Sequence, residues 1–123
     1  MPRRLATVLR EAFASRAELE ADEERREAAS HQCCAVADLT PRRRGEVYGV
    51  LRSVTLRPKE RVQALEAELY DGSGSMQLVW LGRRAIAGIE PGRRGRFSGL
   101  VSEKGGHKTM YNPRYELTPR PGE

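Results

Sequence analysis

The sequence has few of the residues that build large or crosslinked cores. Only 6% of its 123 residues are aromatic, and its two cysteines are the neighbours Cys33 and Cys34. Adjacent cysteines can close only a strained ring, so they cannot crosslink distant segments. No window approaches the ~20 consecutive apolar residues that are needed to cross a bilayer. Because no apolar signal core follows the basic first residues either, we expect a cytoplasmic protein.

Histidine is also scarce, which limits catalytic and metal chemistry. His31 and His107 are the only histidines in the sequence, and neither lies beside a recognisable nucleophile and acid. The segment His31-Gln32-Cys33-Cys34 offers two thiols and one imidazole, which are too few and too crowded for a tetrahedral metal ion. We therefore expect ordinary thiols, no metal, no cofactor and no enzymatic activity.

Charge, in contrast, is abundant and unevenly distributed. Residues 1–40 carry six arginines and eight acids, a net charge of −2, whereas residues 41–123 carry sixteen basic and nine acidic residues, a net charge of +7. A basic second part is typical of nucleic-acid-binding proteins, although it does not choose between DNA and RNA. Charged loops also keep a domain with a small core soluble, and this alternative stays open.

The first forty residues have helical periodicity. Residues 15–30 are rich in helix formers and charge pairs but have almost no apolar face, which predicts a solvent-exposed helix or a partly frayed arm. Before them, an apolar stripe at the spacing of one helix face predicts a helix that docks. The stripe consists of Leu5, Val8, Leu9, Ala12 and Phe13.

From residue 45 the periodicity changes to that of strands. Residues 46–58, 61–71 and 75–81 alternate in polarity between turn residues, which predicts three strands. The link Asp71-Gly72-Ser73-Gly74 tolerates positive φ and predicts a hairpin between the second and third strands. A short helix or turn at residues 83–92 should separate them from two further strands, over residues 93–103 and 107–117.

This order of elements predicts an all-β OB-fold barrel, with five strands and a short helix between the third and fourth, preceded by an N-terminal α-helix. We expect a helical arm and connector over residues 1–40, the OB-fold domain over residues 41–118 and a tail over residues 119–123. Gly49 and Gly99 suit the bends of such a small barrel. This two-part organisation predicts that the barrel folds without residues 1–40.

Alternation also predicts which side chains fill the core. One face of the second strand carries Leu65, Ala67 and Leu69, and one face of the third carries Met76, Leu78 and Trp80. The opposite face of the second strand carries Glu66, Glu68 and Tyr70. We expect Phe97 in the core and Tyr115 packed at the end of the barrel.

Residues 44–118 also resemble a known family. The motifs that carry the resemblance are Asp71-Gly72-Ser73-Gly74, Trp80, Pro91-Gly92, Gly99 and Met110-Tyr111-Asn112-Pro113-Arg114-Tyr115. In this order they resemble the OB module in the wedge domain of the branch-migration helicase RecG, the anticodon-binding-type OB modules and the small single-OB nucleic-acid-binding proteins of high-GC bacteria.

The resemblance implies binding of single-stranded or branched DNA with little sequence preference, in DNA repair or recombination, with RNA as the alternative. The sequence has no G-x-x-x-x-G-K-[ST] phosphate loop, so ATP-driven work is not implied.

In an OB-fold, ligands usually lie across the second and third strands, between the first-to-second and fourth-to-fifth loops. Basic loop residues would follow a phosphate backbone, and exposed tyrosines would stack bases. The basic candidates are Arg57, Lys59 and Arg61 in the first loop and Lys104, His107 and Lys108 in the second. The stacking candidates are Tyr48, Tyr70 and Tyr111. Against this, Glu66 and Glu68 would repel phosphate near Tyr70.

Other arginine clusters would extend a positive track. They are Arg42, Arg43 and Arg44, then Arg83-Arg84, then Arg93, Arg94 and Arg96. The rival hypothesis is a protein-interaction adaptor, in which the charged N-terminal helix recruits a protein partner and the barrel serves only as a platform. The two hypotheses differ in the residues on which binding depends, namely the loops or residues 1–30.

Overall fold

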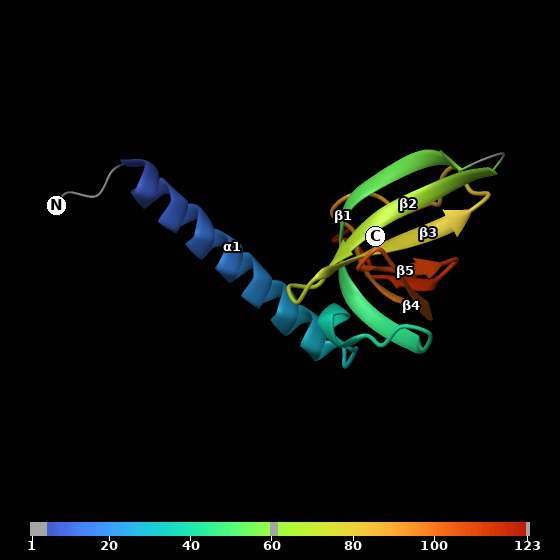
Figure 1. Cartoon of the computed structure of the whole chain (residues 1–123), viewed down its shortest axis with the longest axis horizontal. Coiled ribbons are helices and arrows are strands. Elements are labelled where there is room, and N and C mark those ends of the chain that lie inside the picture. Colours follow the sequence, from blue (N-terminus) through green and yellow to red (C-terminus); the bar gives the residue numbers. More distant parts are fainter. Residues whose placement is uncertain (1–4, 60–61, 123) are drawn as a thin grey trace.

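A computed structural model describes the backbone of residues 5–59 and 62–122, and the side chains of residues 14–58 and 62–122. A long helix, α1 (Leu5–Ser30), is followed by a short 3-10 turn, η1 (Val36–Asp38). Six strands follow: β1 (Arg44–Lys59), β2 (Val62–Tyr70), β3 (Ser75–Leu81), β4 (Arg94–Lys104), β5 (His107–Tyr111) and β6 (Arg114–Leu117). Figure 1 shows α1 as a rod whose C-terminal end meets the strands.

The strands pair in a ring. β1 pairs with β2, β2 with β3, β3 with β5, β5 with β4, and β4 again with β1, while β6 adds to the free side of β4. All pairs are antiparallel except β3 with β5. This mostly-β architecture with one N-terminal helix is consistent with an OB-like fold.

β1 belongs to both sides of the ring because it bends in the middle. Its first half, from Arg44 to Val50, pairs with β4, and its second half pairs with β2. A side chain at Gly49 would collide with the backbone carbonyl of Tyr70, so only glycine allows the two strands to cross here. The bend expected at Gly49 is confirmed, and a register irregularity between Leu51 and Ser53 adds to it.

Two details of the predicted arrangement differ in the structure. Of the short helix or turn expected between β3 and β4, the chain forms turns and the short helix is wrong, because Gly82, Gly88 and Gly92 all have positive φ there. The expected last strand is interrupted at Asn112, which also has positive φ, and at Pro113, which has no backbone N–H. β5 therefore pairs with β3, whereas β6 pairs with the first half of β4.

The core lies inside the ring and matches the alternation of the sequence. The predicted inward faces of β2 and β3 are buried, as is Phe97 of β4. Val36 and Leu39 are buried in the same core. Both precede the boundary expected at residue 41, so the hydrophobic core includes part of the connector.

The predicted hairpin between β2 and β3 is confirmed, and its turn is an anchoring point. The buried carboxylate of Asp71 accepts hydrogen bonds from the backbone N–H groups of Ser73 and Gly74 and from the Ser73 hydroxyl. Its second oxygen accepts from the N–H of Val36 at 2.8 Å. The turn residue thus also holds η1 on the ring.

Helix α1 docks through its second half. Arg25 donates to the Gly72 carbonyl at 3.1 Å, and Ala28 is buried. Gly72 has positive φ, and a side chain there would collide with the helix backbone at Ala21. Of the two alternatives for residues 15–30, the solvent-exposed helix is confirmed, because the helix is continuous and most of its side chains there are exposed, with Ala28 buried. The docking predicted for the stripe from Leu5 to Phe13 concerns side chains outside the described residues.

Among the residues with described positions, no helix combines the length and apolar character that crossing a membrane requires.

Candidate nucleic-acid interface

The outer face of β2 and β3, where the ligand of an OB-fold usually lies, is acidic at its centre. Glu66 and Glu68 point outward from β2, opposite Val79 and Gln77 of β3. A hollow of about 280 Å³ next to them is lined by Glu68, Ser75, Met76, Gln77, His107 and Lys108. Two carboxylates on this face oppose a phosphate backbone, as their place in the sequence indicates.

Of the basic residues expected at one edge of this face, Arg57 already has a partner within the protein. Arg57 forms an ion pair with Glu66 at 2.9 Å. Because this pair neutralises both charges, Arg57 attracts a phosphate less than a free arginine would. Arg61 and the side chain of Lys59 lie outside the described residues.

At the opposite edge, the candidate residues differ in how available their side chains are to a phosphate. Lys104 and His107 face each other across the β4–β5 turn, and both are exposed. Lys108 instead donates to the backbone carbonyls of Val36 and Ala37, at 2.8 and 3.1 Å. Its ammonium group thus holds η1 in place, so it is less available to a phosphate than the sequence indicates.

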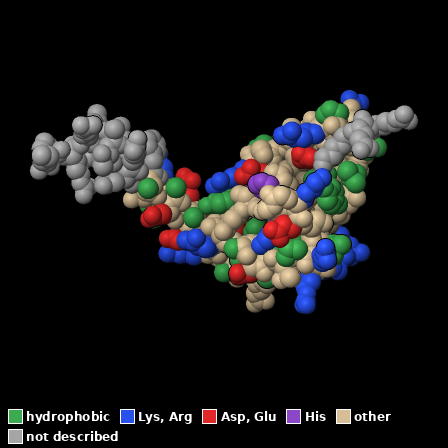
Figure 2. Space-filling view, viewed as in Figure 1, with side chains coloured by type: hydrophobic (Ala, Val, Ile, Leu, Met, Phe, Trp, Pro, Cys, Tyr) green, Lys and Arg blue, Asp and Glu red, His purple; other side chains and the backbone are tan. Residues whose placement is uncertain are grey.

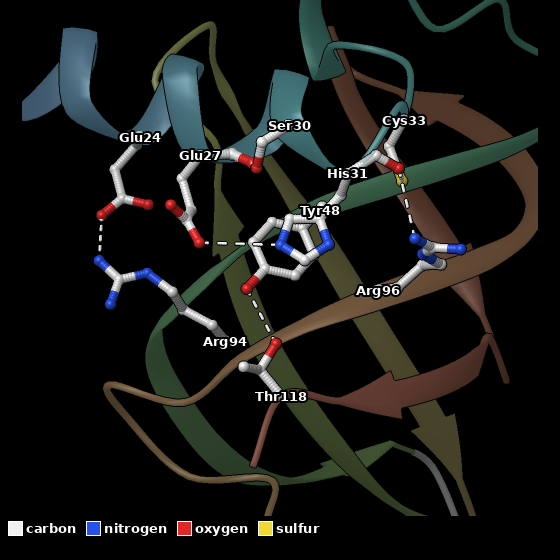
Figure 3. A network of polar contacts seen from close by, with 9 residues as sticks. All are labelled: Glu24, Glu27, Ser30, His31, Cys33, Tyr48, Arg94, Arg96 and Thr118. Carbon is white, nitrogen blue, oxygen red and sulfur yellow. Dashed lines mark hydrogen bonds and ion pairs between the residues drawn. The ribbon is translucent and has the colours of Figure 1, made fainter. Parts of the chain in front are cut away.

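The expectation that Tyr48 is exposed is wrong. The residue is only 2% exposed, although its position on β1 does point outward. His31, just after α1, stacks on its ring at 3.6 Å between ring centroids and 12° between planes. The Tyr48 hydroxyl and the Thr118 hydroxyl are 2.8 Å apart (Figure 3). A base would have to displace His31 to stack here.

Tyr70 is half-buried, and one face of its ring is covered by another side chain. The guanidinium group of Arg52 lies 3.4 Å from the centre of its ring, within the range of a cation–π interaction. The hollow beside them, of about 180 Å³, is lined on the helix side by Glu20, Glu23 and Glu24. These acids make the surroundings of Tyr70 unfavourable for a phosphate backbone.

Tyr111, the third stacking candidate, is exposed. It lies on β5 beside Val79 of β3, on the outer face of the ring. It is therefore the predicted tyrosine whose placement best agrees with base stacking.

The arginines at the start of β4 contact other parts of the protein. Arg93, just before the strand, is buried. Arg94 forms an ion pair with Glu24 of α1 at 2.5 Å, and the Glu24 carboxylate raises the pKa of Arg94 above its usual range. Arg96 contacts Glu46 at 3.2 Å and donates to the His31 carbonyl at 3.3 Å. Arg94 and Arg96 contact α1 and the residue that follows it (Figure 3), so they are less available for the positive track considered from the sequence.

Arg42, Arg43 and Arg44 are all exposed at the start of β1. Their backbone runs along the end of β4, where Arg42 and Arg43 exchange hydrogen bonds with Val101. Arg44 lines a hollow of about 340 Å³ with Gly45, Glu46, Ser98 and Arg114. Arg44 is thus brought together with Arg114, which the sequence did not single out.

Sequence reasoning missed Arg114 because the relevant signal depends on strand register. Ser98 of β4 pairs with Glu46 on one side and with Arg114 on the other, so all three share one face. Alternation within β6 could have placed Arg114 on the face of Glu116, but not opposite Ser98. The sequence likewise contains the acids of α1 that lie beside Tyr70. Their position next to Tyr70 could not be predicted, because it depends on how the helix docks.

The charges are mixed on the side of the molecule in Figure 2. Lys and Arg side chains are spread over the strands with acids among them, and Asp and Glu side chains gather on the described part of α1. The described part of α1 is therefore more acidic than the strands, which agrees with the uneven charge of the sequence.

Comparison with known proteins gives a similarity in fold. No protein-family model matches the chain, and no curated protein matches it. Among solved structures, the chain is similar to RecG in the structure of RecG bound to a three-way DNA junction. The TM-score is 0.56 with 24% sequence identity, over 69% of this chain and 12% of that one. The chain thus corresponds to a small part of that protein's length, and the likeness concerns the fold.

Proposed function

We propose that this protein binds nucleic acid through an OB-type barrel, with single-stranded or branched DNA as its main ligand and little sequence preference. The observation that carries the proposal is the similarity in fold to part of RecG, which was solved bound to a three-way DNA junction. We also propose a role in DNA repair or recombination. RNA is the alternative ligand.

The exposed charges support this proposal. Several cations on the ring and its loops have side chains without a partner among the residues whose side chains are described. They are Arg42, Arg43, Arg44, Arg83, Arg84, Lys104 and Arg114. Unpaired, exposed cations of this kind neutralise phosphates without reading base identity, which fits a ligand of little sequence preference.

Fluorescence anisotropy tests the proposal. Labelled single-stranded DNA, duplex, three-way junction and single-stranded RNA are titrated with the protein at two salt concentrations. We expect the tightest binding to single-stranded or junction DNA, similar affinities for unrelated sequences, and weaker binding at the higher salt concentration. The absence of binding to all four ligands at low salt would refute the function.

The adaptor hypothesis remains as a second function, because the N-terminal half of α1 extends beyond the strands (Figure 1). A variant lacking residues 1–18 separates the two functions, since it keeps the docked part of the helix around Arg25 and Ala28. A nucleic-acid-binding ring should keep its DNA affinity in this variant. An adaptor should bind no nucleic acid in either form, and should lose its protein partner on truncation.

A further inference from the structure

Two arginines lie around one hollow on the ring, away from the centre of the β2–β3 face, and neither has a partner among the residues with described side chains. Arg44 on β1 and Arg114 on β6 both line the hollow of about 340 Å³ over β4. Their strands flank β4, where Arg44 is opposite Leu100 and Arg114 is opposite Ser98. We call this site the β1–β4–β6 hollow and define it by Arg44, Glu46, Ser98 and Arg114.

The charge of this hollow is not balanced from within. Its carboxylate, Glu46, already accepts from Arg96 at 3.2 Å and from the Cys33 thiol. Neither guanidinium group of Arg44 and Arg114 contacts an acid in the described part of the chain. Two like charges around one hollow repel each other, and an anion between them would convert this repulsion into attraction.

The hollow also offers a hydroxyl group and an aromatic ring. The half-buried Ser98 hydroxyl has no hydrogen-bond partner among the described residues, so it is free to donate. Tyr115 is 44% exposed, and the adjoining hollow is lined by Tyr115 together with Glu46, Arg96, Ser98, Arg114 and Glu116. Its ring packs edge-on against Trp80, at 6.0 Å between centroids, which fixes its orientation. Guanidinium groups, a hydroxyl and an exposed ring suit phosphate, sugar and base.

Within the described part of the chain, the β2–β3 face offers a phosphate fewer unpaired cations than the β1–β4–β6 hollow does. There Glu66 neutralises Arg57, Lys108 donates to backbone carbonyls, and Glu68 lines the hollow itself. A phosphate arriving at that face meets negative charge, and two of the cations there, Arg57 and Lys108, already have partners. At the β1–β4–β6 hollow it meets Arg44 and Arg114, which have no partner among the side chains that the structure describes.

We propose that the phosphate backbone of a bound nucleic-acid strand lies in the β1–β4–β6 hollow, contacted by Arg44, Ser98 and Arg114, and that a base stacks on Tyr115. The strand then crosses β1, β4 and β6 instead of β2 and β3. This inference rests on the proposed function, because it names the surface through which that function is carried out.

Charge-matched variants test the location. The probe is a fluorescein-labelled oligothymidylate of about twelve nucleotides, a length within the usual range of one OB-fold. The hollow variant is Arg44→Gln/Arg114→Gln. The first control, Arg83→Gln/Arg84→Gln, removes the same charge from exposed arginines on the β3–β4 connection. The second, Arg57→Gln/Lys104→Gln, removes it from the edges of the β2–β3 face.

We expect the hollow variant to bind the oligothymidylate about ten- to a hundredfold more weakly. The magnitude of its salt slope should fall by about 1.4, since each lost contact to a single strand contributes ~0.7. Both controls should lose less affinity and keep a steeper slope. All three pairs are exposed, so equal melting temperatures would show that each variant is folded.

A second measurement does not depend on substitutions. In a ¹⁵N-labelled protein, addition of unlabelled oligothymidylate should shift the Nε–Hε signals of Arg44 and Arg114 more than those of Arg83 and Arg84. If the wild type binds but the Arg57→Gln/Lys104→Gln variant loses most affinity, the location is wrong and the proposed function stands. If the wild type does not bind the probe, the junction or RNA, both fail together.

Discussion

His31 lies flat on the ring of Tyr48, with 3.6 Å between ring centroids and 12° between planes. This contact joins the end of α1 to the outer face of β1, and it explains why an outward-facing tyrosine is buried. Around it, Glu24 binds Arg94 and Arg96 donates to the His31 carbonyl (Figure 3). The ring and the helix therefore share one stacked and charged interface.

The first prediction concerns this stack. Replacing His31 by alanine should lower the free energy of unfolding by about 0.5–1.5 kcal/mol, because an aromatic pair is lost. His107→Ala is the matched control, since that histidine is exposed at the β4–β5 turn, and it should leave the free energy of unfolding unchanged. Urea denaturation followed by circular dichroism measures both. Equal stability of the two variants would show that the stack contributes nothing.

The second prediction concerns Asp71. Its buried carboxylate accepts from the N–H groups of Val36, Ser73 and Gly74, so Asp71→Ala leaves donors without partners. We expect a loss of roughly 2–5 kcal/mol in the free energy of unfolding. The exposed Glu103 provides a control, because Glu103→Ala removes a carboxylate from the end of β4. A thermal melt of Asp71→Ala that overlays that of Glu103→Ala would contradict the anchoring role.

The third prediction concerns the two thiols. Burial raises the pKa of the Cys33 thiol, Glu46 raises it further, and Arg96 lowers it. A raised pKa leaves less thiolate at pH 8, so Cys33 should react with iodoacetamide more slowly than the exposed Cys34. Its rate should continue to rise at a pH where the rate of an unperturbed thiol has levelled off. Mass spectrometry of Cys33→Ser and Cys34→Ser proteins measures each rate separately.

Removing each charge next to Cys33 should change its labelling rate in a defined direction. Glu46→Gln should speed the labelling of Cys33, whereas Arg96→Gln should slow it, because the two charges have opposite effects on the same pKa. Faster labelling of Cys33 than of Cys34 in the parent protein would contradict the effect of burial.

The fourth prediction concerns truncation. A protein lacking residues 1–18 should melt cooperatively, because the docked part of α1 is kept. A protein lacking residues 1–40 loses Val36 and Leu39 from the core and should be less stable by about 3–5 kcal/mol. Differential scanning calorimetry compares the two with the parent. If both truncations have the stability of the parent, the connector is not part of the core.

Much of the ring could be predicted from the sequence because strands leave a local signal. Alternation placed Leu65, Leu69 and Leu78 inside, and the Asp71-Gly72-Ser73-Gly74 link fixed the hairpin. Both patterns involve residues that are close in the sequence, so they can be recognised without knowing the tertiary structure. The sequence of residues 83–92 does not distinguish a turn from a short helix. The positive φ of its glycines, which makes the distinction, is known only from the structure.

The candidate site was harder to predict because exposure depends on contacts between distant residues. The alternation of β1 correctly pointed Tyr48 outward, yet His31 covers it. Lys108 looked like a loop cation, but the carbonyls of Val36 and Ala37 hold it. Arg114 became a candidate only once the register placed it opposite Ser98. Each outcome depends on pairs separated by many residues, which a pattern within one strand does not report.

The bent strand β1 has a consequence for how the chain folds during synthesis. Its residues from Arg44 to Val50 pair with residues from Arg94 to Leu100, so the ring cannot close until β4 has left the ribosome. Until then the β1–β2–β3 sheet has an unpaired edge, and such an edge can pair with another chain. The ion pair between Glu24 of the helix and Arg94 must also wait, because Arg94 is made late. We expect nascent chains that end before β4 to bind chaperones and longer ones to be released from them.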